Sequence, residues 1–152
     1  MQLLPHLACE KLPECGNLST SREDAGHLDL SRGRAARHMK LHLLRQAPTR
    51  EQFHDMLEAQ GSYIKLAVDV AQGGVVGGGE YHADCEELLL AQGSRQEDIW
   101  GADWYPESHT VTFAALINIR PRQGNRSMEV QDPTLRTRIE HVVRAVFEGV
   151  TP

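Results

Sequence analysis

Side chains with the chemistry of a metal-assisted hydrolase are concentrated between residues 77 and 126. His82, Asp84 and Glu86 occur at every second position, and Asp103 follows further along the chain. Alternate residues of a β-strand point to one face of its sheet. An imidazole and carboxylates on such a face could hold Mg²⁺, Mn²⁺ or Zn²⁺, whose bound water would be the nucleophile of a hydrolase or nuclease-like reaction. His82, Asp84 and Asp103 are therefore candidate catalytic residues and candidate metal ligands.

Basic side chains form a second group of candidates. The segment RPRQGNR contains Arg120, Arg122 and Arg126 together with Asn125. Guanidinium groups bind carboxylates and phosphates through paired hydrogen bonds. With Glu86, these residues indicate a binding site for a small anionic ligand or a protein partner, or they could stabilise negative charge that develops in an enzyme reaction. The alternative is structural, with acidic side chains and arginines forming ordinary surface ion pairs and holding the ends of strands and helices.

An antiparallel sheet is the predicted framework of these side chains. Gly93 and Ser94 suit a two-residue type II′ turn between two apolar runs. We therefore expect a hairpin in which Asp84 lies directly opposite Asp103, although the first arm could instead be a short helix. A second turn over residues 106–109 would return the chain as the next strand.

This register sorts the predicted sheet into two faces. The core face would carry Tyr81, Ala83, Cys85, Leu89, Trp100, Ala102, Trp104, Val111, Phe113, Ala115, Ile117 and Ile119. The polar face would carry Glu80, His82, Asp84, Glu86, Glu97, Asp103, Tyr105, Thr112, Asn118 and Arg120. Two like charges directly opposite each other, here Asp84 and Asp103, destabilise a bare sheet. We expect compensation by a metal ion, by a carboxyl group that stays protonated, or by one of the three arginines.

Two helices are predicted to flank the sheet. Thr49 and Gln52 form a capping box at the start of a helix over residues 49–60. Asp132 and Pro133 begin the last helix, whose apolar residues recur at helical spacing. Both helices therefore have one apolar stripe, which we expect to pack on the sheet.

The expected fold is a single α+β domain over residues 39–152, an antiparallel four-stranded meander with an N-terminal and a C-terminal helix packed on one face. Residues 63–70 alternate as a half-buried strand does. The glycine-rich segment 72–79 lacks the spacing of phosphate-binding loops, and it predicts a hairpin turn and a strand in close backbone contact. Residues 1–38 show no apolar period, and we expect either a disordered extension or a mis-assigned start.

Composition narrows the class of partner. With a net charge of −5 and a pI near 5.9, the molecule as a whole has no long-range attraction for nucleic acid or anionic lipid. No apolar run approaches the roughly eighteen residues of a membrane span. The odd number of cysteines and a start unlike a signal peptide favour a reducing cytoplasm. Cys9 and Cys15 match no common zinc spacing and are expected to be unpaired thiols.

Several uncommon strings occur in series: YIKLAVDV, GGGEYHADCE, GSRQEDIWGADWYP, LINIRP and NRSMEVQDP. In these strings the chain resembles a family of small bacterial proteins, domain-of-unknown-function family 5674, over about residues 39–147. The resemblance implies a bacterial protein and brings no activity with it. From the residues, we expect a binding or regulatory module with a polar sheet face, and a homodimer is one arrangement it could adopt. The alternative is a metal-dependent hydrolase or nuclease-like enzyme, and a divalent metal is the one cofactor that the residues suggest.

Overall fold

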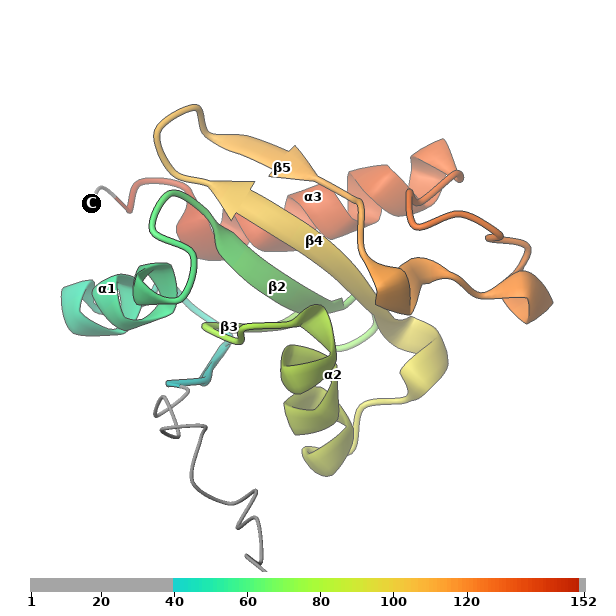
Figure 1. The fold of residues 1–152 in the computed structure, drawn as a ribbon, viewed down its shortest axis with the longest axis horizontal. Coiled ribbons are helices and arrows are strands. Elements are labelled where there is room, and N and C mark those ends of the chain that lie inside the picture. Colours follow the sequence, from blue (N-terminus) through green and yellow to red (C-terminus); the bar gives the residue numbers. More distant parts are fainter. Residues whose placement is uncertain (1–39, 151–152) are drawn as a thin grey trace, which may run out of the picture. The chain divides into compact units, whose positions relative to one another are not determined.

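The computed structural model describes residues 40–150, which lie within one compact unit of the chain (Figure 1). The strands are β1 His42–Leu44, β2 Ile64–Asp69, β3 Gly74–Gly77, β4 Ile99–Tyr105 and β5 Thr110–Thr112. The α-helices are α1 Arg50–Glu58, α2 His82–Ala91 and α3 Pro133–Phe147. Short 3₁₀ helices follow at Gln96–Asp98 (η1), Leu116–Asn118 (η2) and Pro121–Gln123 (η3). The expectations for residues 1–38, with Cys9 and Cys15, fall outside the described residues.

The predicted α+β class and antiparallel sheet are confirmed, but the number and order of the strands differ from the expected meander. The sheet has five strands in the order β1-β3-β2-β4-β5. All of its neighbouring pairs are antiparallel. The fifth strand is β1, which pairs with β3 at the edge. Because β3 lies between β1 and β2, the chain does not run through the sheet in sequence order.

The predicted hairpin at Gly93 and Ser94 is wrong, because the segment before it is helix α2. Cys85, Leu88 and Leu89 are spaced as one face of a helix, and all three contribute to a buried or partly buried cluster. Gly93 has φ +92° directly after the helix end. A glycine in this conformation ends a helix as readily as it begins a type II′ turn, so the same residue supports both predictions.

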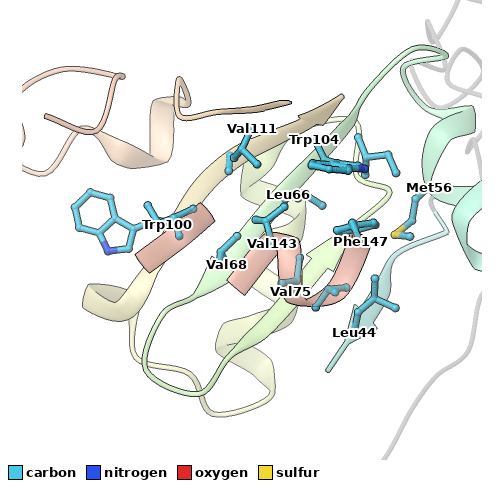
Figure 2. Packing of buried hydrophobic residues seen from close by; sticks show 14 of the residues in the cluster. Leu44, Met56, Leu66, Val68, Val75, Trp100, Trp104, Val111, Val143 and Phe147 are labelled. Carbon is cyan, nitrogen blue, oxygen red and sulfur yellow. The ribbon is translucent and has the colours of Figure 1, made fainter. Parts of the chain in front are cut away.

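One face of the sheet packs against α1 and α3. Both helices begin as predicted: Thr49 and Gln52 form the capping box of α1, and the Asp132 side chain caps α3. The main cluster contains Trp104 of β4 and Phe147 of α3, whose rings stack with centroids 5.8 Å apart (Figure 2). Packing two large aromatic rings against each other removes apolar surface from water and stabilises the contact between β4 and α3.

The other face of the sheet is covered by α2, on the side away from α3 (Figure 1). Cys85 and Leu89 pack against Ala67 of β2, Val76 of β3 and Ile99 of β4. The sheet therefore has two covered faces, and the polar face expected from the sequence is confined to the part of the sheet near the start of α2.

The turn between β4 and β5 is close to the prediction, but the strand after it is shorter. Trp104 pairs with Val111 and Tyr105 with Thr110, as the turn position predicts. β5 ends at Thr112, so the expected core positions beyond it are not strand residues. Ile119 is 44% exposed, and Tyr81, placed on the same core face, is 53% exposed.

The glycine-rich segment is a strand in close contact with its surroundings, as expected. A Cβ atom on Gly77 would lie 2.8 Å from the sulfur of Met56, which is closer than packed atoms approach. Gly78 has φ +96°, and a Cβ there would lie 2.3 Å from the Lys40 carbonyl oxygen. These glycines are therefore explained by packing and backbone conformation.

No helix within residues 40–150 has the length and apolar character required to cross a membrane.

Candidate functional site

A polar cluster joins the start of α2 to strands β4 and β5. Asp103 of β4 is 7% exposed. His82 Nε2 lies 2.9 Å from Asp103 Oδ1, and the Thr112 hydroxyl donates to Asp103 Oδ2 at 3.3 Å. Because a carboxylate accepts hydrogen bonds, a proton on Nε2 of His82 would be donated to Asp103 Oδ1. Two of the three predicted catalytic residues are therefore brought together.

Further polar groups lie beside this cluster. Lys65 of β2 is the cross-strand neighbour of Asp103, and its ammonium group donates to the carbonyl oxygen of Glu80 at 3.0 Å. Tyr63 and Tyr105 stack with ring centroids 5.2 Å apart. Under the rest of α2 the same sheet face is apolar. The region near the start of α2 therefore offers an imidazole, an ammonium group and hydroxyl groups.

Asp84, the third predicted catalytic residue, does not face Asp103. It lies in the first turn of α2, where its Oδ2 accepts a hydrogen bond from the backbone N–H of Tyr81 at 2.8 Å. A carboxylate at this position satisfies a free backbone donor and interacts favourably with the helix dipole. The expected cross-strand pair of like charges, and the need to compensate it, came from the wrong hairpin register.

The predicted metal ligands do not form a complete set. Within residues 40–150, no three side chains of histidine, cysteine, aspartate or glutamate are placed to share one ion. His82 and Asp103 supply two donors, and Asp84 is turned to the helix start.

Glu86 and Arg120, two of the predicted binding residues, form an ion pair between α2 and the loop after β5. Arg120 Nη2 lies 3.0 Å from Glu86 Oε1, and the side chains are 10% and 13% exposed. The guanidinium also donates to the carbonyl oxygens of Ile117 and Gln96 and lies over the ring of Trp100. Burial lowers the pKa of Arg120, and the negative charge of Glu86 opposes that shift. Arg120 therefore holds the loop in place.

Asn125, another predicted binding residue, is also used within the fold. Its amide donates to the carbonyl oxygens of Asn118, Ser127 and Glu129, and its Oδ1 accepts from the N–H of Gln131. With 5% of its surface exposed, it cannot reach a ligand without breaking these bonds. Asn125 and Arg120 therefore fit the structural alternative, in which these side chains hold the ends of strands and helices.

Arg122 and Arg126 are exposed, and Arg122 lines a groove between α2, η1 and the loop of η2 and η3. The groove has a volume of about 730 Å³. Its charged lining residues are Glu86, Glu97, Arg120 and Arg122, and its apolar lining includes Leu116 and Ile119. Leu116 is 73% exposed and Ile119 is 44% exposed. The groove therefore combines exposed apolar side chains with charged groups.

Sequence reasoning did not predict the exposure of Leu116 and Ile119. It placed Ile119 on the core face of a long strand, whereas the chain turns into η2 after β5. Leu116 and Ile117 are consecutive apolar residues, and this break in alternation is the signal that could have ended the predicted strand earlier.

Cys85 offers no reactive thiol. It is fully buried, and burial raises its pKa from the ordinary value of 9.0 to about 12. The neutral thiol packs in the cluster below α2. A role as nucleophile is therefore not supported by its surroundings.

Comparison with known proteins identifies the family of the chain. Residues 42–146 match the family described as protein of unknown function, DUF5674. The chain belongs to this family. The match covers the whole sheet and nearly all of α3, so the DUF5674 residues include both the cluster at His82 and the groove. No curated protein and no solved structure matches the chain.

Proposed function

We propose that this protein is a binding module and that another protein docks on the groove lined by Leu116, Ile119 and Arg122. The observation that carries the proposal is the exposure of two large apolar side chains, 73% for Leu116 and 44% for Ile119, on one wall of a groove. Exposed apolar side chains that cluster beside polar groups are typical of protein interaction surfaces.

The loop that presents these side chains is firmly held. Between Leu116 and Ile119, the buried Asn118 side chain makes three hydrogen bonds to the backbone of Gly101 and Phe113. Ile117 packs into the cluster below α2. An ordered surface loses little conformational entropy when a partner binds, so a loop fixed in this way supports a docking role.

Site-specific photo-cross-linking tests the proposal. We would make two variants of the chain, one with a photo-reactive benzophenone amino acid at position 116 and one with it at position 128. Each variant would be irradiated in cells that naturally make the chain. Met128 is a matched control because it is 46% exposed and does not line the groove. An adduct with a second protein from position 116 and none from position 128 is the expected result. Equal adducts from both positions, or none from either, would contradict a docking site at the groove.

A second candidate function is a hydrolase, and the pairing of His82 with the buried Asp103 favours it. A carboxylate that holds one imidazole nitrogen as a donor leaves the other nitrogen as a general base. With no proton on Nε2, His82 and Asp103 could instead give two ligands to a Mg²⁺ or Mn²⁺ ion whose remaining ligands are water and substrate phosphate oxygens.

Hydrolysis of bis(4-nitrophenyl) phosphate and 4-nitrophenyl acetate, with and without Mn²⁺, tests this second candidate. We expect a rate that falls about a hundredfold or more in His82→Asn. In Asp84→Asn, whose side chain lies in the helix cap, we expect a near-normal rate. A rate that is the same in wild type and His82→Asn would rule the hydrolase out for both substrates.

A further inference from the structure

We infer that the partner binds the groove through an acidic amphipathic segment. An apolar side chain of that segment packs on Leu116 and Ile119, while a carboxylate pairs with Arg122. This inference rests on the proposed function and adds the chemistry of the partner. It follows from the charged side chains that line the groove. Glu86, Glu97 and Arg120 have ion-pair partners among residues 40–150, and Arg122 has none there.

Both acidic side chains of the groove already have a basic partner. Glu86 lies 3.0 Å from Arg120, and Glu97 pairs with Arg95 beside η1. The Glu86 carboxylate is thus committed to a largely buried pair, whereas the exposed Glu97 shares Arg95 with Asp98. The Arg120 guanidinium is likewise committed to Glu86 and to two backbone carbonyl oxygens.

Arg122 is the charge that remains. It is exposed and lines the groove. No carboxylate of residues 40–150 lies within ion-pair distance of it. Its guanidinium can therefore form a bidentate pair with a partner carboxylate. Leu116 and Ile119 line the same groove, so one short segment with apolar and acidic residues could reach all three side chains.

The net charge of the whole chain favours a basic partner, so the inference of an acidic partner can be distinguished from simple attraction by net charge. With a net charge of −5, the protein as a whole attracts basic peptides and repels acidic ones. At physiological ionic strength this attraction decays over about 8 Å. A preference for an acidic peptide would therefore have to arise from contacts within the groove.

Two peptides of equal length distinguish these outcomes by NMR titration of the full chain. One is an acetylated, amidated octapeptide of leucine and glutamate; the other has lysine in place of every glutamate. We expect the glutamate peptide to bind about tenfold more tightly and to shift the amide signals of Leu116, Ile119 and Arg122. In Arg122→Glu we expect the preference to reverse.

Arg45→Glu is the matched control, because Arg45 is exposed after β1, does not line the groove, and its reversal changes the net charge equally. It should keep the preference for the glutamate peptide. Equal binding of the two peptides, a preference unchanged by Arg122→Glu, or no binding of either peptide would overturn the inference. The proposed function would still stand if position 116 cross-links to a partner, and it would fall only with the cross-link.

Discussion

The side-chain amide of Asn118 pairs with both backbone groups of Gly101. Asn118 Oδ1 accepts from the Gly101 N–H at 2.8 Å, and Asn118 Nδ2 donates to the Gly101 carbonyl oxygen at 3.0 Å. These are the two bonds that a neighbouring antiparallel strand would exchange with Gly101. Because β5 ends at Thr112, Asn118 continues the edge of β4 and fixes the loop that forms the groove.

Replacing Asn118 with alanine should strongly destabilise the fold. The change removes three hydrogen bonds and leaves the buried N–H and carbonyl oxygen of Gly101 without partners, while the Phe113 carbonyl keeps its bond from the Val130 N–H. Each unsatisfied buried group costs about 1–3 kcal/mol, so we expect a loss of about 3–5 kcal/mol in the free energy of unfolding. Urea denaturation measures it. A loss below about 1 kcal/mol would contradict the anchoring role of Asn118.

The ion pair between Glu86 and Arg120 should contribute more to stability than an exposed ion pair. Removing Glu86 leaves the Arg120 guanidinium, 10% exposed, without its carboxylate. We expect Glu86→Ala to cost about 3 kcal/mol, since breaking a largely buried pair leaves an unpaired charge. The control is Glu140→Ala, which breaks an i,i+4 pair with Arg144 whose side chains are 40% and 35% exposed, and it should cost at most about 0.5 kcal/mol. Equal losses in denaturant unfolding would refute the difference.

Local signals predicted those parts of the fold that are determined locally. The capping box at Thr49 and the cap at Asp132 with Pro133 located α1 and α3, and the turn after Tyr105 fixed the register of β4 with β5. α2 was missed because the positive φ of Gly93 fits two structures. Once that segment was assigned to a strand, the pairing of β4 with β2 could not be found, since strands distant in sequence pair through tertiary packing.

The candidate site was predicted in part and for a partly wrong reason. His82 and Asp103 do meet, but through the start of a helix that lies over the strand. Arg120 was correctly connected with the acidic side chains, and its partner is Glu86. The exposure of Leu116 could not be predicted, because it depends on Asn118 and Arg120 directing the chain out of the sheet.

The thiol of Cys85 should react slowly and make the fold sensitive to alkali. Its pKa is raised by burial from 9.0 to about 12, so its thiolate fraction near pH 8 falls about a thousandfold. In a variant with Cys9 and Cys15 replaced by serine, we expect slow labelling by Ellman's reagent in the native state and rapid labelling in urea. Rapid native labelling would contradict the burial of Cys85.

The raised pKa of Cys85 also predicts the direction in which stability changes with pH. Above pH 9 the unfolded thiol ionises while the folded one stays protonated, so the folded state binds more protons. The contribution of Cys85 to stability is therefore complete below about pH 9 and declines by about 1.4 kcal/mol per pH unit up to about pH 12. The decline should be shallower in Cys85→Ala. Identical slopes for both proteins between pH 9 and pH 10.5 would contradict the assignment.

Gly101 should not tolerate a side chain unless Ala115 gives up its own. A Cβ atom on Gly101 would lie 2.4 Å from the Cβ of Ala115 and 3.0 Å from Cγ1 of Ile117, well inside van der Waals contact. Overpacking of this kind costs about 1–3 kcal/mol, and Gly101→Ala should lower the melting temperature accordingly. Combining it with Ala115→Gly removes the closest contact, so the double variant should be more stable than the sum of the two single changes predicts. Strict additivity in thermal unfolding would mean that β4 and the loop after β5 do not meet at these residues.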